Sequence, residues 1–225
     1  MHIAKSILVL IVTIAFVLYL VNQCRKPSGW LGRFFLWEMG GRHVGVTDWG
    51  LSHIELKPHY TVLDVGCGGG RTISKLAAIV RDGKVFGIDY SGASVAASRS
   101  RNQQLITNNR VEIHRGTVSQ LPFSDSMFDV VTAVETHYYW PDLVADLREI
   151  LRTLKPGGQL VIIAEAYKRT NFDPTRGAMK LLRAAYLSAN EHREVFEQAG
   201  YSDVEIFEER RKGWICATGR KAESA

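Results

Sequence analysis

From residue 61 onward, short apolar runs alternate with segments whose apolar residues recur at helical spacing. The runs are typical of buried strands, and the segments between them are typical of helices packed on a sheet. We expect strands at residues 62–65, 85–89, 111–114, 128–134, 160–164, 204–209 and 214–219. We expect helices at residues 46–54, 72–80, 91–102, 142–154 and 191–199. This alternation predicts an α/β domain with a parallel sheet, closed by two strands that form an antiparallel edge.

Polar residues and a glycine mark several of the expected helix ends. Thr47 or Asp48 is expected to cap the helix at 46–54, because a short polar side chain there can accept a hydrogen bond from a free amide of the first turn. Ser91 is expected to do the same for the helix at 91–102. Gly200 follows the last helix and is a typical C-cap.

The N-terminal segment contains an uncharged apolar run at residues 7–21, and Ile3 and Ala4 extend it past Lys5. At ~1.5 Å per residue, about 19 residues reach across a ~30 Å hydrocarbon core. Residues 1–26 are therefore predicted to form a transmembrane anchor. A cleaved signal peptide is the alternative, but the run is long and no small-x-small cleavage site follows it. Residues 27–57 are expected to form an interfacial or lid segment, and residues 58–225 the folded domain.

Flanking charges predict the orientation of this single-pass anchor. Arg25, Lys26 and Arg33 follow the apolar run, whereas Lys5 and the terminal amine precede it, which places the folded domain in the cytoplasm. Residues 1–60 carry +3 of the net charge of +5, so an anionic membrane surface is a plausible partner. The folded part has no basic stripe interleaved with aromatic residues, and no nucleic-acid partner is expected.

Size and cysteine content narrow the class of protein further. A chain of 225 residues with 46% apolar content suits one globular domain with a small appendage, and it needs no disulfides. Cys24, Cys67 and Cys216 lie far apart and lack metal-ligand spacing, so a reducing compartment and no metal site are expected. Cys67 is then a small residue of a loop.

The most informative segment is residues 62–71, where an apolar run passes through Asp64 into the glycines Gly66, Gly68 and Gly70. Glycines allow a tight turn and a close approach of the backbone to a ligand. A dinucleotide site requires G-x-G-x-x-G, but this chain has G-x-G-x-G. The Asp64 carboxylate would repel a pyrophosphate and would suit a ligand with positive charge. Asp89 closes the next apolar run, where it is placed to accept hydrogen bonds from ribose hydroxyls.

These residues carry a family resemblance. Residues from about 44 to 219 resemble a class I S-adenosylmethionine-dependent methyltransferase, in the branch that includes the quinone-biosynthesis C-methyltransferases. The matching segments, in the family's order and spacing, are residues 64–70, 87–91, 121–123, 128–131 and 154–158. The resemblance implies a Rossmann-like, doubly wound, seven-stranded and mostly parallel sheet with helices on both faces and an antiparallel last strand.

The resemblance also implies a cofactor site for S-adenosyl-L-methionine. Asp64 and the loop residues would hold the methionine part, and Asp89 would hold the ribose. The loop residues are Gly66, Cys67, Gly68 and Gly70. Tyr90 could cover one face of the adenine, although a packing tyrosine is nearly as good a reading.

The adenine end of the site departs from the family's pattern. Thr117 stands where this branch often has an acid that accepts a hydrogen bond from the adenine amine. The Thr117 hydroxyl or the backbone of Val118 could replace part of that contact.

The residues just past the fourth expected strand are the candidates for chemistry, because ligands bind beyond the carboxyl ends of such strands. Glu135 and His137 are the acid and imidazole so placed, and each could be a general base or orient the acceptor. The alternatives are a pocket wall for His137 and a contact with the cofactor's amino group or a backbone amide for Glu135. Aromatic faces attract a sulfonium, so the following residues could form an electron-rich wall: Tyr138, Tyr139 and Trp140.

Two further groups are weaker candidates. The expected lid offers Arg42, Trp49 and His53 for substrate contact. The residues after the fifth strand could steer an anionic acceptor, although a solvated surface run is the default. They are Tyr167, Lys168 and Arg169.

The sequence therefore predicts a membrane-anchored S-adenosylmethionine-dependent methyltransferase. Its expected partners are a small, lipophilic acceptor dissolved in the membrane, such as a quinone precursor, lipid, hydrophobic thiol or phenol, and the membrane lipids around the anchor. The alternative is a cofactor-binding scaffold or assembly factor without turnover. A nicotinamide-dependent dehydrogenase is disfavoured by Asp64 and by the missing third fingerprint glycine.

Overall fold

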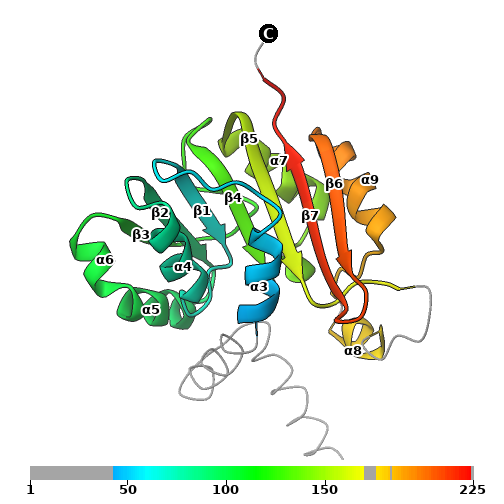
Figure 1. The fold of residues 1–225 in the computed structure, drawn as a ribbon. Helices are drawn as coiled ribbons and strands as arrows, with labels where there is room; N and C mark the ends of the chain where they lie inside the picture. Colours follow the sequence, from blue (N-terminus) through cyan, green and yellow to red (C-terminus); the bar gives the residue numbers. More distant parts are fainter. Residues whose placement is uncertain (1–42, 170–175, 183, 224–225) are drawn as a thin grey trace, which may run out of the picture.

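The computed structural model describes residues 43–169, 176–182 and 184–223, whose strands form one seven-stranded sheet (Figure 1). The strand order is β3-β2-β1-β4-β5-β7-β6. The strands are β1 (Thr61–Val65), β2 (Lys84–Asp89), β3 (Val111–Arg115), β4 (Phe128–Val134), β5 (Leu154–Ala164), β6 (Ser202–Glu209) and β7 (Trp214–Arg220). Each apolar run of the sequence thus forms a strand, and the α/β prediction is confirmed.

The sheet is parallel from β3 to β5, and β7 is inserted antiparallel between β5 and β6. The predicted mostly parallel sheet with an antiparallel last strand is therefore correct. The strand order reverses at β1, which lies between β2 and β4. In such sheets, ligands bind beyond the carboxyl ends of the strands at this switch point. The fold accordingly brings the ends of β1, β2 and β4 together as a site.

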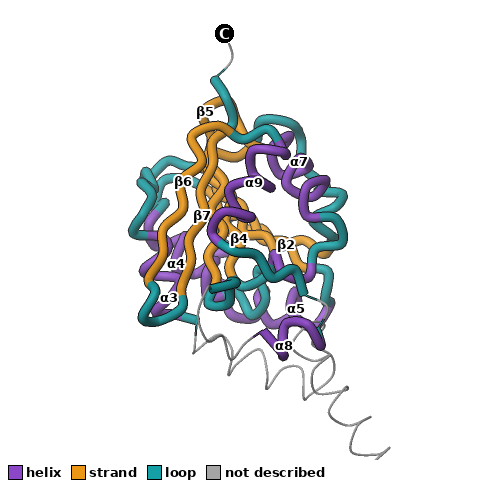
Figure 2. The backbone as a smooth tube through the Cα atoms, turned by 90° about the vertical axis from the view of Figure 1, so that its right-hand side faces the viewer, coloured by secondary structure: helices purple, strands orange, loops and turns teal. Residues whose placement is uncertain are grey.

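Helices cover both faces of the sheet. They are α3 (Val44–Leu51), α4 (Arg71–Ile79), α5 (Gly92–Arg101), α6 (Gln103–Thr107), α7 (Leu143–Thr153), α8 (Arg176–Leu181), α9 (Ala189–Ala199) and the 3₁₀ turn η1 (His137–Tyr139). Figure 2 shows α3 and α4 on one side of the sheet and α7 and α9 on the other. Helices α3 and α4 pack on β5 and β2, whereas α7 and α9 pack on β5 and β6.

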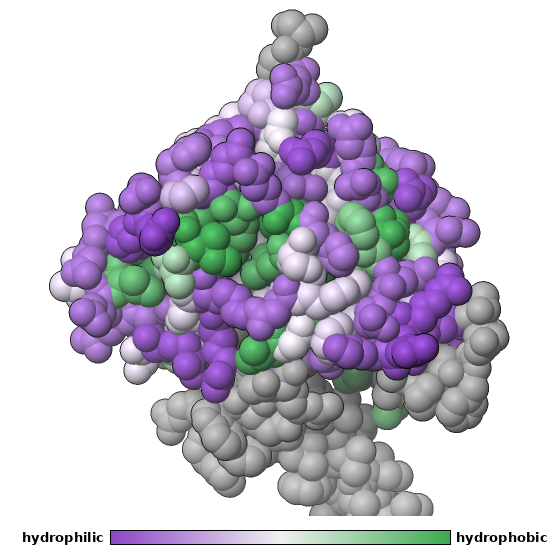
Figure 3. Space-filling model, viewed as in Figure 1, coloured by the Kyte–Doolittle hydropathy of each residue, from purple (hydrophilic) through white to green (hydrophobic). Residues whose placement is uncertain are grey.

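Two buried clusters fill the space between the sheet and the two helix layers. Neighbouring residues of β1 point to opposite faces of the sheet: Leu63 packs on the α7 and α9 side, and Val62 packs on the α3 and α4 side. Buried on both faces, the strands read as continuous apolar runs in the sequence. On the outer face that carries α3, apolar side chains gather in the middle and hydrophilic ones surround them (Figure 3).

Two of the three expected helix caps are confirmed. The Ser91 side chain accepts a hydrogen bond from the Ser94 amide, and Gly200 ends α9 with a φ of 99°. The expected cap at Thr47 or Asp48 is wrong, because α3 begins earlier, at Val44. Thr47 instead lies inside the helix, where its hydroxyl donates to the His43 carbonyl at 2.7 Å.

Strand β5 and two short helices differ from the expectation. β5 begins at Leu154 rather than at residue 160, because Leu154 pairs with Phe128 and the following turn stays in the sheet. Gly157, with a φ of 72°, makes this possible. Helices α6 and α8 were not expected, since their five and six residues are too short for a periodic pattern.

The predicted anchor at residues 1–26 lies outside the described residues, as does most of the expected lid segment at 27–57. The described part of that segment starts at His43 and contains α3. Within the ranges that the structure describes, every helix is too short or too polar to cross a bilayer.

Candidate cofactor and acceptor site

The loop between β1 and α4 turns sharply at the carboxyl end of β1. Gly66 and Gly68 have φ values of 73° and 50°, which favour glycine over other residues. A Cβ on Gly66 would overlap the side chain of Thr136, which follows β4. The amides of Gly66 and Cys67 both donate to the Ile88 carbonyl of β2, at 2.8 and 3.1 Å. The glycines thus let the loop lie between the ends of β2 and β4.

Asp89, the last residue of β2, faces this loop. Its two carboxyl oxygens accept hydrogen bonds from the Gly68 amide at 3.0 Å and from the Ser91 amide at 2.8 Å. Burial raises the pKa of Asp89, and these two amides oppose the rise. Each carboxylate oxygen has a second lone pair. Asp89 can therefore fix the loop and still accept hydrogen bonds from two ligand hydroxyls.

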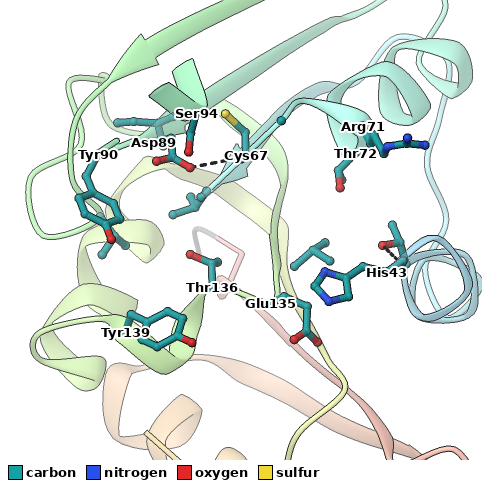
Figure 4. A pocket seen from close by; sticks show the side chains of 18 of the residues that line it. His43, Cys67, Arg71, Thr72, Asp89, Tyr90, Ser94, Glu135, Thr136 and Tyr139 are labelled. Carbon is teal, nitrogen blue, oxygen red and sulfur yellow. Dashed lines mark hydrogen bonds between the residues drawn. The ribbon is translucent and has the colours of Figure 1, made fainter. Parts of the chain in front are cut away.

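A cavity of about 380 Å³ opens beside the loop and Asp89. In Figure 4, Asp89, Tyr90 and Ser94 lie toward one end, and His43, Arg71 and Thr72 toward the other. Glu135 lies on the His43 side. The cavity therefore joins a polar end built by β2 and its following loop to an end built by α3, α4 and β4.

Most of the predicted site residues line this cavity. They are Gly66, Cys67, Gly68, Asp89, Tyr90, Thr117, Val118 and Glu135. Two of the three residues of the predicted aromatic wall, Tyr139 and Trp140, line the cavity, whereas Tyr138 is buried behind it. Asp64, Gly70 and His137 do not line it, for three different physical reasons.

Asp64 lies beneath the cavity, within the sheet. Its Oδ1 accepts a hydrogen bond from the Thr132 hydroxyl of the neighbouring strand β4 at 2.8 Å. Burial, opposed by this hydrogen bond, raises the pKa of Asp64 to about 7. Asp64, predicted to contact the methionine part of the cofactor, therefore links β1 to β4 through Thr132 and does not line the cavity.

Gly70 serves helix packing instead of ligand approach. It is the N-cap of α4 with a φ of 77°. A Cβ at this position would overlap Ser98 of α5 and Asn102, which follows the last residue of that helix. The side-chain Nδ2 of Asn102 donates a hydrogen bond to the Gly70 carbonyl at 3.0 Å. The third glycine thus sets how closely α4 approaches α5.

Glu135 is the buried acid that does line the cavity. It has a φ of 56°, which is uncommon for a residue with a Cβ. One carboxyl oxygen accepts hydrogen bonds from the Glu165 amide and, at 3.4 Å, from the Tyr138 hydroxyl. Burial raises the pKa of Glu135 to about 8, although the Glu165 amide opposes this. At neutral pH these surroundings favour the neutral acid, and a ligand with positive charge would favour the carboxylate.

Binding of a cationic ligand is expected to release a proton from Glu135. Before the ligand binds, the Glu135 carboxyl is mostly protonated at about pH 7.5, and a cation beside it lowers its pKa. The observed binding enthalpy of S-adenosylmethionine should therefore differ between phosphate and Tris buffers, and less so for S-adenosylhomocysteine, which lacks the sulfonium. Calorimetric titration measures this difference. Glu135→Gln should remove it, and equal heats in both buffers for the unmodified protein would contradict the assignment.

The structure places His137, a predicted candidate for the catalytic base, away from the cavity. The side chain is fully buried, and its Nε2 lies 3.3 Å from Nε2 of His192 on α9. Burial, followed by the influence of His192, lowers the pKa of His137 well below its ordinary value. The tight 3₁₀ turn η1 explains the error: it presents Tyr139 to the cavity and turns His137 into the core.

The buried histidine pair predicts a loss of stability in acid. The pKa values of His137 and His192 are lowered in the fold, so below about pH 6.5 the unfolded chain binds protons that the folded chain does not. The free energy of unfolding should fall by up to about 1.4 kcal/mol per pH unit for each histidine. Asp64 and Glu135 act oppositely, because their raised pKa values cost stability as pH rises toward 7 and 8.

Urea unfolding between about pH 7.5 and 5.5 tests this, with a His137→Leu/His192→Leu double variant as the comparison. The unmodified protein should lose stability faster on acidification than the double variant. Parallel pH profiles for the two proteins would contradict the lowered pKa values, because the pair would then bind as many protons in the folded chain as in the unfolded one.

The weaker candidates lie away from the cavity. Trp49 packs against Trp214, and His53 stacks on Phe207 at 4.1 Å. Lys168 is held by an ion pair of 2.7 Å with Glu191. Tyr167 is buried and Arg169 lies by its ring. Arg42 lies outside the described residues.

Other cavity residues were missed by the sequence reasoning. They are His43, Val44, Thr47, Gly69, Arg71, Thr72, Lys75, Ser94, Arg101, Thr136 and Pro141, with apolar strand residues beside them. Arg71 and Thr72 directly follow the glycine loop, so the position of α4 could have pointed to them. Nothing local in the sequence marks His43, which reaches the cavity only because α3 packs across β5.

The fold and the site together define a class. A seven-stranded sheet of this order, with a glycine loop after β1 and buried acids at the ends of β2 and β4, has the arrangement that the resemblance to class I S-adenosylmethionine-dependent methyltransferases implied. Residues 63–162 match the protein family described as "Methyltransferase domain". Residues 63–162 thus carry a methyltransferase domain, and similarity to S-adenosylmethionine-dependent methyltransferases agrees with the predicted family and cofactor.

A demethylmenaquinone methyltransferase of Bacillus mycoides is 34% identical over 111 residues, which are 49% of this chain and 46% of that protein. The chain thus spans about half the length of this curated relative. A chain of the complex between the Haloferax volcanii Trm112 methyltransferase activator and a putative methyltransferase has a similar fold, with a TM-score of 0.75 at 23% identity, over 86% of this chain and 96% of that chain. The [4+2]-cyclase SpnF is also similar in fold, with a TM-score of 0.65 at 22% identity, over 80% of this chain and 81% of that chain.

Proposed function

We propose that this protein is a membrane-anchored methyltransferase that transfers the methyl group of S-adenosylmethionine to a small, lipophilic acceptor such as a quinone precursor. The observation that carries the proposal is the composition of the cavity. Asp89 and the glycine loop form one part of it, whereas Val44, Tyr139 and Trp140 give another part apolar and aromatic walls. The cavity also reaches His43, where the chain arrives from the predicted anchor, so an acceptor dissolved in the membrane would be close at hand.

Several residues would hold the cofactor. Asp89 would accept hydrogen bonds from the ribose hydroxyls, Tyr90 would lie against the adenine, and Thr117 with Val118 would border it. Glu135 would face the positive charge of the methionine part. The cofactor supplies a methyl group that its sulfonium already activates for displacement.

The protein's share of the chemistry is alignment in a site that excludes water. Holding two reactants in line can contribute ~7–11 kcal/mol to the barrier reduction. The rings of Tyr139 and Trp140 present electron-rich faces to a cation at low cost in conformational entropy. The loop glycines keep the backbone close to the ligand, and the hydrogen bonds of Asp89 keep that loop in place.

The relative from Bacillus mycoides supports a quinone-type acceptor, since its name states demethylmenaquinone as its substrate. The predicted anchor at residues 1–26 supports a membrane location with the catalytic domain on the cytoplasmic side, where S-adenosylmethionine is made. The relative's name thus supports the class of acceptor, and the predicted anchor supports the cellular location.

An acceptor panel tests the function. The full chain, purified in detergent, is given S-adenosylmethionine labelled in the methyl group and one acceptor at a time: short-chain demethylmenaquinol, a long-chain alkyl phenol, an alkyl thiol and a water-soluble catechol. Mass spectrometry should find label on a lipophilic acceptor in preference to the catechol. Label on the catechol alone would remove the lipophilic part of the proposal.

The second candidate is a cofactor-binding scaffold or assembly factor without turnover. The likeness to a [4+2]-cyclase favours keeping it, because it shows that this fold also occurs in a protein named for a different reaction. Binding of S-adenosylhomocysteine without methylation of any acceptor in the panel would support this candidate over the first.

A further inference from the structure

We propose that His43 is the catalytic base that takes the proton of the acceptor, and that Glu165 is the residue that positions it. This inference rests on the proposed methyl transfer and deepens it. His43 lines the cavity and its side chain is 20% exposed. Among the described residues that line the cavity, it is the one imidazole. It is thus both reachable by an acceptor and shielded from bulk water.

The partner of His43 suits a base. Nε2 of His43 lies 3.9 Å from a carboxyl oxygen of Glu165, which directly follows β5. A carboxylate at this distance stabilises the imidazolium that forms when the ring accepts a proton. The backbone of Glu165 is fixed in turn, because its amide donates to the Glu135 carboxyl.

Glu135 and His137 fit the role of base less well than His43. The carboxyl of Glu135 is held by a backbone amide and a tyrosine hydroxyl, and its negative charge is stabilised only beside the cation of the cofactor. His137 is buried away from the cavity. The structure therefore separates two tasks: Glu135 faces the positive charge of the cofactor, and His43 faces the acceptor.

The charges around this end of the cavity are mixed. In the described residues, the titratable and charged groups that line or flank it are Glu135 after β4, Glu165 after β5, Tyr139 in η1, Arg71 and Lys75 in α4, and Asp48 in α3. Lys75 forms an ion pair with Asp48, which offsets its charge. A carboxyl oxygen of Glu165 approaches the His43 ring to 3.9 Å, so its charge should affect the titration of that ring.

An acceptor with a hydroxyl group would lose a proton to His43 and gain the methyl group in the same step. The proton of the acceptor's O–H moves to the His43 ring, and the electron pair left on the acceptor forms the bond to the methyl carbon. The pair comes from oxygen in a phenol and from the adjacent ring carbon in a quinol, where that carbon then loses its own proton. The pair of the broken carbon–sulfur bond returns to sulfur, which leaves a neutral thioether. His43 then returns its proton to solvent.

The test uses the full chain in detergent, with short-chain demethylmenaquinol as the acceptor and His59→Asn as the matched control. His59 is exposed and does not line the cavity. His43→Asn should lower kcat by about 100-fold or more, as expected for loss of a general base, and leave the affinity for S-adenosylhomocysteine unchanged. His59→Asn should match the unmodified enzyme. A His43→Asn enzyme with normal kcat would overturn the proposal.

The positioning role of Glu165 has a separate readout. In NMR spectra of the protein labelled with ¹³C in its histidines, Glu165→Gln should lower the pH at which His43 titrates. The acid limb of the pH profile of kcat should move to lower pH by the same amount. An unmoved His43 titration would overturn the pairing. These spectra can be recorded without turnover, so they separate the two proposals. If no acceptor is methylated, the proposed function fails. If demethylmenaquinol leaves the His43 resonance unchanged, His43 does not contact this acceptor.

Discussion

Replacing Asp89 by alanine is expected to reduce the affinity for S-adenosylhomocysteine by about 10²–10⁴-fold. A hydrogen bond to a charged group contributes about 1.5–3 kcal/mol, and the carboxylate can accept one from each ribose hydroxyl. The substitution also removes the acceptors of the Gly68 and Ser91 amides, which now fix the glycine loop at 3.0 and 2.8 Å. Calorimetric titration of the full chain in detergent measures the loss.

Two further variants make the Asp89 result specific. Asp82→Ala removes an exposed acid at the other end of β2, on the turn that precedes the strand, and should bind normally. Asp89→Asn keeps the shape and one oxygen acceptor, so it should fall between alanine and the unmodified protein. Near-normal binding by a folded Asp89→Ala protein would mean that the ribose lies elsewhere, and the whole orientation of the cofactor in the cavity would have to be reversed.

The second large effect is expected for Gly66→Ala, which should both destabilise the fold and impair cofactor binding. A residue with a Cβ at a φ of 73° costs about 1–2 kcal/mol, and overpacking adds about 1–3 kcal/mol. The new Cβ would lie 2.6 Å from the Cβ of Thr136. Because Thr136 also lines the cavity, relief of the overlap would move the cavity wall. Thermal unfolding and S-adenosylhomocysteine titration measure the two consequences.

The matched control for this variant is Gly177→Ala. Gly177 lies in α8, and a Cβ there meets no atom within 4 Å, so the substitution should leave binding unchanged and should not lower stability. Combining Gly66→Ala with Thr136→Gly removes the overlap but keeps the strained backbone. We expect this double variant to recover part of the stability. Full stability of the single Gly66→Ala variant would show that the loop can adopt another conformation.

The seven strands, most of the helices and several residues of the cavity, among them Gly66, Gly68 and Asp89, could be predicted from the amino-acid sequence. These follow from local rules: apolar runs become strands because the sheet is buried on both faces, and Gly66, Gly68 and Asp89 lie where parallel strands end. The family resemblance of the same motifs is confirmed by the match of residues 63–162. Positions that depend on strand ends are predictable, because every parallel strand of such a sheet presents its carboxyl end to the same edge.

The tertiary structure alone decided which side chains reach the cavity. Asp64 and His137 stand at promising places in the sequence, but the strand pleat directs the first toward Thr132 and the 3₁₀ turn directs the second toward His192. His43 has no local signal, yet the packing of α3 across β5 brings it beside Glu165. The orientation of a side chain after a strand end depends on turns of one or two residues and on partners more than 50 positions away, which local patterns do not encode.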